Sequence, residues 1–421
     1  MTQVVIVGAG FAGLSAVRGL SKAGAAVTII DKNLYSTFQP LLYQVATGGL
    51  NPGDIAYSVG GFVGRQRAGS PRPGTARYLR GDVASVDADG RRVKLTDGRD
   101  VGYDYLILAT GVAAAYFGVE GAAENTFGLY TRADAIVLRD HIMTGYERMS
   151  GNDGRDFNIV VVGGGATGVE LAGTLGELRG AVLRATFPDV DPERVHVRLV
   201  EMAPGLLMPF NSRLRDYARR QLVGRGVDIR LGTEIKAVRP DSVLLGDGQV
   251  LPSDLTVWAA GVAAPGVVAD WGLPQGKGGR ILVEADLRVR GQDRIFAAGD
   301  IALYPDGPSP QLAQPALQEG RHVAAQINHL LAKEPTQPFA YHDKGIMATI
   351  GRRSAVVQFP HGLRVTGTFA WLAWLALHLF YLLGGRNRVS TLINLTWRYI
   401  AWGHGGGVIV GDDPPASRRV G

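Results

Sequence analysis

The apolar positions near the N-terminus form two short runs separated by glycines and a helical pattern. Val4–Val7 is the first run, Leu14–Lys22 has helical spacing, and Val27–Ile30 is a second run that ends at Asp31. Apolar runs of this length, bounded by turn signals and alternating with a helix, predict a β-turn-α-β unit with parallel strands.

The same pattern returns in the middle of the chain. Asn158–Val162 predicts a strand, a helix follows through about Leu183, and Val195–Val200 predicts the next strand, which ends at Glu201. Three other apolar runs each lead into a glycine: Tyr105–Ala109, Leu255–Ala260 and Ile295–Ala298. The pattern predicts an α/β protein with two Rossmann-like units and small antiparallel sheets between them.

From about Gln337 the pattern changes. Phe369–Leu383 and Val389–Trp402 are apolar stretches. The first has 15 residues and as a helix spans roughly 22 Å, less than the ~30 Å of a hydrocarbon core. The wider uncharged segment Val365–Gly385 has 21 residues and reaches the transmembrane range of about 17–25, so a crossing stays open. We expect two short helices that lie in the membrane interface.

Charge and aromatic residues favour the same interpretation. From His361 to the end, six arginines accompany only two acids, Asp412 and Asp413, a net charge of +4. Basic residues attract anionic lipid, and tryptophans concentrate at the headgroup level, where we expect Trp371 and Trp374. The C-terminal part is therefore predicted to bind a membrane surface.

Composition narrows the functions further. With 421 residues the chain is too long for one ordinary domain. It has no cysteine, which excludes disulfides, thiolate metal ligands and redox-active dithiols, and no metal site is predicted. The net charge of +6 includes no dense Lys/Arg block, so nucleic acid is not an expected partner. The first residues are typical of a buried strand rather than a secretory signal.

Glycines after the first strand have the spacing of a dinucleotide fingerprint. Gly8 permits a tight turn, Gly10 lets the backbone approach a pyrophosphate, and Gly13 lets the helix pack close to the sheet. Asp31 lies 18 residues after Gly13 at a strand end, where a carboxylate can accept hydrogen bonds from ribose hydroxyls. The context of strand, loop, helix and acid predicts a dinucleotide site.

A second fingerprint follows the strand that ends at Val162. Its glycines are Gly163, Gly165 and Gly168, and its acid, Glu201, lies 33 residues after Gly168, more than the usual spacing of about 20. The extra length indicates an insertion between helix and strand. An acid at this place repels a 2′-phosphate, so the site should prefer NADH to NADPH. Thr167 and Gly261 are further expected contacts.

Two dinucleotide sites imply two dinucleotides, and the simplest interpretation is an FAD that is held permanently and an NAD(P)H that visits. The order of GAGFAGL, ATG at 109–111, GGGATGVE at 163–170 and FAAGD at 296–300 resembles the two-dinucleotide-domain flavoprotein reductases. In that superfamily the FAAGD aspartate, here Asp300, lies near the ribityl chain and pyrophosphate of FAD. The resemblance implies further FAD contacts at Phe11, Ala12, Lys32, Gln39, Thr110, Gly111 and Gly299.

Three further stretches resemble the type II NADH:quinone oxidoreductases: Phe38–Ala46, Ala313–Gln318 and Lys344–Gly351. In that family the paired glutamines of the second stretch line the quinone site beside the flavin. Gln314 and Gln318 are four apart and so share a helix face. The resemblance covers nearly the whole chain. Ser36 stands where many relatives carry a histidine, which leaves the detail of the quinone mouth open.

Other candidate residues come from the same resemblance. Glu170 is placed by it between the nicotinamide and quinone sites, to orient the nicotinamide or deliver protons, although a carboxylate at a helix N-terminus also has a structural role. Lys344 can stabilise negative charge on reduced flavin or quinone, or be an ordinary surface lysine. His378, in the apolar tail, is expected to be a packing or interfacial residue.

These observations predict an NADH:quinone oxidoreductase that transfers a hydride from NADH to FAD and two electrons to a membrane quinone, without proton pumping. The predicted division is 1–115 and 262–340 for the FAD domain, 116–261 for the NADH domain, and 341–421 for a membrane-associating region. We expect it to be monotopic, on the cytoplasmic face of the cell membrane. The sequence leaves the identity of the quinone, the order of substrate binding and a homodimer open.

Three rivals share parts of this pattern. A sulfide:quinone oxidoreductase needs cysteines, and the chain has none. A soluble reductase of ferredoxin or rubredoxin predicts no apolar tail and gives no reason for the glutamine pair. A redox sensor that binds NADH without turnover stays open, and steady-state turnover with a short-chain quinone separates it from an enzyme.

Overall fold

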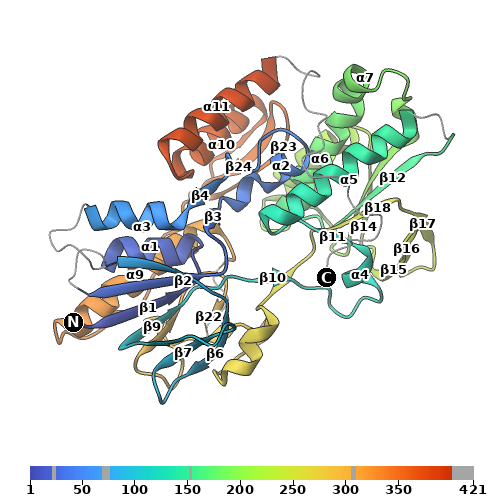
Figure 1. Cartoon of the computed structure of the whole chain (residues 1–421). Coiled ribbons are helices and arrows are strands. Elements are labelled where there is room, and N and C mark those ends of the chain that lie inside the picture. The colour runs from blue at the N-terminus through green and yellow to red at the C-terminus, as the bar shows by residue number, and fades with distance from the viewer. Residues whose placement is uncertain (21–24, 69–75, 151–153, 305–309, 401–421) are drawn as a thin grey trace. The chain divides into compact units, whose positions relative to one another are not determined.

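The computed structural model describes residues 1–20, 25–68, 76–150, 154–304 and 310–400, which form two compact units (Figure 1). The first unit contains Met1–Ser36, Tyr57–Ala113 and Val262–Asp343. The second contains Thr37–Ala56, Ala114–Gly261 and the chain from Lys344 onward. Four short strands lie where the chain passes from one unit to the other: β3 (Tyr35–Thr37), β4 (Ala56–Ser58), β10 (Ala113–Ala114) and β19 (Val262–Ala263).

The first unit is built on a five-stranded sheet in the order β21–β9–β1–β2–β5, with every neighbouring pair parallel. The strands are β1 (Gln3–Val7), β2 (Ala26–Asp31), β5 (Ala76–Arg80), β9 (Tyr105–Leu108) and β21 (Ile295–Ala297). Val4 to Val7 are all buried, which is typical of a parallel strand covered on both faces. The predicted first β-turn-α-β unit is therefore present.

The α-helices in the described part of this unit are α1 (Phe11–Leu20), α3 (Val59–Ala68) and α9 (Ala313–Leu331). Helix α1 packs against α9 through small residues. A Cβ on Gly320 would lie 2.1 Å from the Ala12 carbonyl oxygen, and one on Gly19 would lie 2.6 Å from Ala324 Cβ. Smaller pieces complete the unit: the antiparallel strands β6 (Val83–Asp87), β7 (Arg92–Leu95) and β8 (Asp100–Gly102), and the parallel pair β20 (Ile281–Leu282) and β22 (Ala302–Leu303).

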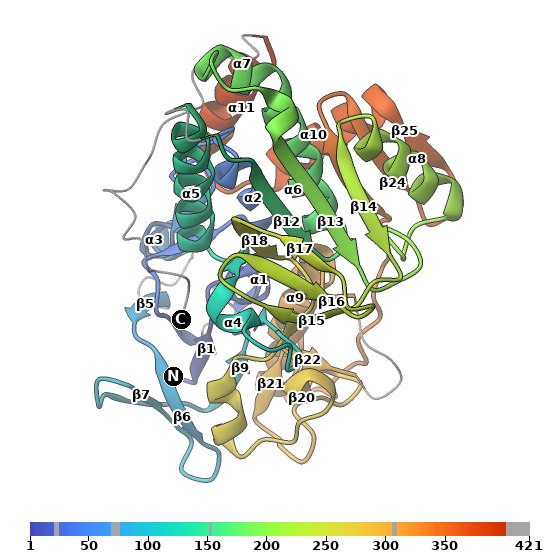
Figure 2. The ribbon, with the colours of Figure 1, turned by 90° about the vertical axis from the view of Figure 1, so that its right-hand side faces the viewer.

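The second unit repeats the plan with a parallel sheet in the order β11–β18–β12–β13–β14, of which Figure 2 shows β18, β12, β13 and β14. Its strands are β11 (Phe127–Gly128), β12 (Phe157–Val162), β13 (Val195–Glu201), β14 (Val227–Leu231) and β18 (Leu255–Trp258). Its helices are α4 (Ala122–Asn125), α5 (Arg132–Ser150), α6 (Ala166–Glu177), α7 (Leu183–Thr186) and α8 (Ser212–Val223). The two parallel sheets confirm the predicted fold class.

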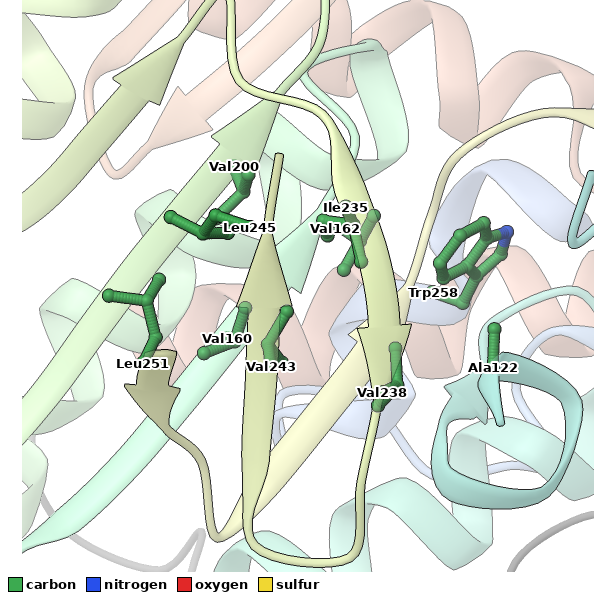
Figure 3. Close-up of a cluster of buried hydrophobic side chains, with 10 residues drawn as sticks. All are labelled: Ala122, Val160, Val162, Val200, Ile235, Val238, Val243, Leu245, Leu251 and Trp258. Carbon is green, nitrogen blue, oxygen red and sulfur yellow. The ribbon is translucent and has the colours of Figure 1, made fainter. Parts of the chain in front are cut away.

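An antiparallel sheet covers part of the second parallel sheet. Its strands are β15 (Ile235–Val238), β16 (Ser242–Leu245) and β17 (Val250–Pro252). Figure 3 shows the buried side chains between the two sheets, among them Val160, Val243 and Trp258. Trp258 comes from the end of β18, so this core extends to the edge of the parallel sheet where a dinucleotide is expected.

The C-terminal part packs onto the second unit through the antiparallel strands β23 (Ile346–Gly351), β24 (Ser354–Gln358) and β25 (Arg364–Thr366). Two helices follow, α10 (Gly367–Tyr381), which packs on β24, and α11 (Gly385–Ile400). Among the residues that the structure describes, no helix is long and apolar enough to cross a membrane.

The prediction that Trp371 and Trp374 lie at the level of the lipid headgroups is wrong. Trp371 is 8% exposed and Trp374 is 1% exposed. Trp371 belongs to a buried cluster with Ala355 and Val357 of β24, so the indole rings pack inside the unit instead of facing the headgroups. The prediction failed because an apolar helix does not reveal from composition which of its sides faces protein.

Candidate functional site

The first glycine loop connects β1 to α1 in a tight turn. Gly8 has φ +104°, and a Cβ there would lie 2.2 Å from the Ala109 carbonyl oxygen, so only glycine fits. A Cβ on Gly13 would lie 1.9 Å from the Gly8 carbonyl oxygen, which shows how closely α1 starts against the strand. Next to Gly10 there is open space. Gly8 and Gly13 are therefore required by contacts within the protein. Gly10 is not, and the space beside it can be filled by a ligand.

The second glycine loop, between β12 and α6, has the same geometry. Gly163 has φ +107°, and a Cβ there would lie 2.7 Å from the Ala259 carbonyl oxygen. A Cβ on Gly168 would lie 1.9 Å from the Gly163 carbonyl oxygen, and next to Gly165 there is again open space. Gly165 and Thr167 are both exposed at the start of α6. Each predicted fingerprint is thus a loop at a helix N-terminus in which no side chain covers the backbone at the middle glycine.

The strand-end acids occupy equivalent positions in the two units. Asp31 accepts hydrogen bonds from Ala9 N at 2.7 Å and from Asn33 N at 2.7 Å. Glu201 accepts from Gly164 N and from Ala203 N, the latter at 2.6 Å. Each carboxylate therefore tethers its own glycine loop. Burial is the largest influence on Asp31 and raises its pKa, partly offset by the hydrogen bonds from Asn33 and Ala9.

The residues present fit a bound dinucleotide in both loops. A pyrophosphate needs backbone N–H groups at a helix N-terminus with no side chain in the way, and both loops supply them. A ribose needs a carboxylate at the end of the next strand, and Asp31 and Glu201 are there. Glu201, whose side chain is longer than that of Asp31, accepts a hydrogen bond from Gly164 N although an insertion separates the two in sequence. This insertion forms a π-helical turn at Leu178–Val182 and the short helix α7.

A third glycine turn belongs to the first unit. Gly299, with φ +79°, donates its N–H to Glu319 Oε2 at 2.5 Å, and a Cβ on Gly299 would lie 3.2 Å from Ala12 Cβ. Burial raises the pKa of the adjacent Asp300 to about 6, opposed by the positive charge of Arg280. Arg280 donates to the carbonyl oxygens of Asp300 and Ala302. The sequence analysis did not single out Arg280 or Glu319, which hold the turn that carries Asp300.

The other predicted first-site residues are spread over both units. Phe11, Ala12, Lys32, Thr110 and Gly111 lie in the first unit, and Gly111 has φ +69°. Gln39 lies in a short 3-10 helix of the second unit, Gln39–Leu41.

Glu170 lies inside the second unit, on the buried side of α6. Its Oε1 accepts Thr349 N of β23 at 3.2 Å, and the side chain of Trp374 from α10 also hydrogen-bonds to it. Strand β23 comes this close because Gly173 has no side chain: a Cβ there would lie 1.8 Å from the Ile350 carbonyl oxygen. Burial raises the pKa of Glu170 to about 8, and these two hydrogen bonds oppose that rise.

Trp374, which hydrogen-bonds to this carboxyl group, is itself packed among other aromatic side chains. Tyr43 of α2 (Leu42–Ala46) lies 6.2 Å, ring to ring, from Trp374 and accepts a hydrogen bond from Gln44 at 2.8 Å. His378 stacks on Trp374 at 4.0 Å, and burial lowers its pKa to about 4. His378 is thus a packing residue, as expected. The Phe38–Ala46 motif was the only sequence signal for this surrounding.

The remaining candidates differ in their surroundings. Gln314 and Gln318 lie on α9 of the first unit. Gln318 makes two hydrogen bonds of 3.0 Å to the backbone of His342, so its amide is occupied within the protein. Gln314 is half-buried, and its side-chain amide has no hydrogen-bond partner among the described residues. Lys344 is exposed.

Comparisons with known proteins agree with this geometry. The family model described as pyridine nucleotide-disulphide oxidoreductase matches residues 2–320. A type II NADH:quinone oxidoreductase of Mycobacterium tuberculosis is 38% identical over 95% of this chain and 86% of its own. Another, from Staphylococcus aureus, is 32% identical over 84% of this chain and 89% of its own. The structure of NDH2 from Plasmodium falciparum in complex with NADH has a TM-score of 0.87 at 19% identity, over 96% of this chain and 99% of that one.

Proposed function

The chain belongs to the type II NADH:quinone oxidoreductases and to the pyridine nucleotide-disulphide oxidoreductase family, and from that premise we propose that it oxidises NADH and reduces a quinone with FAD as its bound cofactor. The observation that carries this proposal is the pair of equivalent glycine loops, each tied to a strand-end carboxylate. Asp31 is assigned to the FAD loop and Glu201 to the NADH loop.

When bound, FAD supplies a carrier that takes up a hydride and releases two electrons singly or as a pair. The chain's own residues bind and orient the reactants. Gly10 and the N-terminus of α1 bind the pyrophosphate of FAD, and Asp300 lies at the turn assigned to its ribityl side. Gly165 and Glu201 bind NADH and reject the 2′-phosphate of NADPH.

Quinone reduction also needs protons, and Glu170 is the residue assigned to hold one. A carboxyl group with a pKa of about 8 is mostly protonated at neutral pH and can act as an acid. Gln314 is assigned to a quinone carbonyl, because its half-buried side-chain amide takes part in no hydrogen bond between residues that the structure describes. Gln318 then keeps the neighbouring segment in place through His342. Lys344 is assigned to the stabilisation of negative charge during reduction.

Helices α10 and α11 are assigned to the membrane surface. Phe369, Leu372, Leu377 and Phe380 of α10 are 38–80% exposed and recur at helical spacing. On α11 the exposed residues Val389, Leu392, Ile393 and Trp397 do the same, at 47–67%. Each helix thus presents one apolar stripe outward, which favours monotopic binding in the interface plane. We assign this binding to the cytoplasmic face of the cell membrane.

The test is anaerobic. The purified yellow protein is titrated with NADH while flavin absorbance is followed, and a short-chain quinone is then added. We expect bleaching by one equivalent of NADH and full recovery of the absorbance with quinone. Bleaching without recovery by any quinone contradicts the quinone assignment, and a protein without flavin contradicts the whole proposal.

A second experiment tests the membrane assignment. The full chain should sediment with vesicles, and protease outside sealed inside-out vesicles should reach its C-terminal segment. Protection of that segment from external protease, or a protein that stays in the soluble fraction at low salt without detergent, contradicts the monotopic assignment.

A further inference from the structure

The loop at the start of the second unit contains a strained aromatic residue. Phe117 has φ +51° and Gly118 has φ +75°, and Val119 N donates to the Tyr116 carbonyl oxygen at 3.0 Å. Positive φ at both central residues is the geometry of a type I′ turn, in which glycine, asparagine and aspartate predominate. A bulky residue here is an outlier, and such strain concentrates at ligand-binding sites.

The turn is held firmly by its neighbours. Ala115 N donates to the Gly261 carbonyl oxygen at 3.3 Å, and the Trp258 indole N–H donates to the Ala115 carbonyl oxygen at 2.9 Å. The ring of Tyr116 lies 5.5 Å from that of Trp258, whose side chain Figure 3 shows at the edge of the buried cluster. Tyr116 therefore packs inward, whereas Phe117 is 72% exposed. The fold thus holds an apolar ring in water at a defined place.

That place is the end of β18. A Cβ on Gly261 would lie 2.3 Å from Cζ and 2.4 Å from Cε2 of Phe117, so the ring covers this glycine. In the sheet β18 neighbours β12, and β12 neighbours β13. Glu201 ends β13 and the Gly163 loop follows β12. A dinucleotide with its adenosine at Glu201 and its pyrophosphate at the loop therefore extends its nicotinamide half toward β18 and Phe117.

We propose that Phe117 is a binding residue for NADH, whose ring packs against the nicotinamide half of the molecule. The inference rests on the proposed NADH site. The apolar face of Phe117 loses contact with water when the cofactor binds, and a planar aromatic ring suits an offset stack on nicotinamide. The ring is already in position before binding because the type I′ turn and Tyr116 hold it, so little conformational entropy is lost.

The test is calorimetric titration of NAD⁺ into the purified full chain with its FAD, since NAD⁺ cannot reduce the flavin. Phe117→Ala should raise the dissociation constant about tenfold, and Phe117→Tyr should stay within about twofold of wild type. Phe117→Gly should weaken binding as much as Phe117→Ala while its thermal midpoint rises by roughly 2 °C, because glycine relieves the backbone strain. Phe359→Ala, at an aromatic side chain that is 39% exposed in the same unit, is the matched control and should bind like wild type.

Two outcomes overturn the inference. Wild-type affinity in Phe117→Ala shows that the ring does not touch the cofactor. A lower thermal midpoint together with weaker binding in Phe117→Gly shows that the ring only supports the loop. Failure of the proposed function looks different: the wild-type protein itself then binds no NAD⁺, and its flavin is not reduced by NADH.

Discussion

A single buried carboxyl group determines much of the expected pH behaviour. Glu170 receives Thr349 N–H and a hydrogen bond from Trp374, yet burial raises its pKa to about 8. A carboxyl with a raised pKa is a proton donor below that value and an anion above it. Three segments far apart in the chain thus set the protonation state of one residue.

The quinone half-reaction should therefore slow as the pH rises through about 8. Glu170→Gln should remove this inflection and lower the rate about 100-fold, since an acid–base group contributes roughly that much. The rate of the quinone half-reaction is measured at each pH by stopped-flow oxidation of the reduced protein with a short-chain quinone, and the NADH half-reaction is the internal control. An unchanged pH profile in the variant assigns the proton to another group.

The same group has a stability signature. Its folded-state pKa of about 8 lies above the ordinary value of 4.5. The contribution of the protonated Glu170 to the free energy of unfolding is therefore fully present below pH 4.5 and is lost as the pH rises toward 8. Thermal midpoints measured between pH 5 and 8 should fall less steeply for Glu170→Gln than for wild type, because glutamine does not titrate.

Glu201 is the residue that we propose determines the choice between NADH and NADPH. Its carboxylate tethers the second loop through Gly164 N and Ala203 N. Glu201→Gln keeps the size and one of the two acceptor oxygens but removes the charge that repels a 2′-phosphate. The ratio of kcat/KM for NADH over NADPH should fall about tenfold, equivalent to ~1.4 kcal/mol. Asp31→Asn, the equivalent change in the first loop, should instead lower FAD content and leave this ratio unchanged.

At the scale of elements, α11 is attached to the second unit by polar contacts. Asp54 accepts Ser390 Oγ at 2.6 Å, Asn394 Nδ2 at 2.6 Å and Asn51 N at 3.1 Å, and Asn387 donates to the Ala56 carbonyl oxygen at 2.8 Å. Polar residues therefore supply the hydrogen bonds on the inner side of α11, where Leu395 is also buried, and Val389, Leu392, Ile393 and Trp397 face outward. This inverts the usual arrangement of an amphipathic helix on a soluble protein.

Removal of this attachment should loosen α11 without unfolding the protein. Asp54→Ala leaves the Ser390 and Asn394 donors without their acceptor, at a cost of about 1–3 kcal/mol. Hydrogen exchange should increase in residues 385–400, and the global thermal midpoint should change little. Asp54→Asn retains one acceptor and should have an intermediate effect. Unaltered exchange in α11 for Asp54→Ala means that other contacts hold the helix.

The apolar stripe of α11 can be tested with one charge. The test variant is Ile393→Glu, at a residue that is 60% exposed. The matched control is Val223→Glu on α8, at a residue that is 54% exposed. A carboxylate in the lipid interface opposes burial and repels anionic headgroups. Vesicle sedimentation should show at least a roughly fivefold loss for Ile393→Glu and no loss for the control. Equal behaviour of the two variants excludes α11 from the membrane contact.

At the scale of the whole molecule, one substitution in each glycine loop should weaken the binding of one dinucleotide and leave the other bound. Gly10 and Gly165 are equivalent, and a Cβ at either meets no protein atom within 4 Å. Alanine at either position should therefore leave the fold intact and obstruct only the pyrophosphate.

Gly10→Ala should yield a folded protein with little FAD, visible as loss of the yellow flavin absorbance. Gly165→Ala should keep its FAD and show a KM for NADH raised about tenfold or more. Circular dichroism verifies that both variants are folded. If Gly10→Ala retains FAD and Gly165→Ala loses it, the assignment of the two loops is reversed.

The sequence by itself determined the two β-turn-α-β units, their glycine loops and the acids Asp31 and Glu201. These features were predictable because each fingerprint is local: a strand, a turn and a helix follow one another, and the glycines are required by backbone geometry. The exposed apolar stripe of α10 was not visible in the same way, since an almost continuous apolar stretch has no clear period.

Only the tertiary structure decided which segments meet. Residues 37–56 and 344–400 pack with the second unit, which brings Thr349 and Trp374 to Glu170 and Tyr43 to Trp374. Glu170 and Thr349 are 179 positions apart, and no local pattern encodes such a contact. Burial of Trp374, the occupied amide of Gln318 and the strained turn at Phe117 likewise depend on packing between distant segments. Periodicity reports which residues avoid water, and the partner they pack against is chosen by the fit of complete elements.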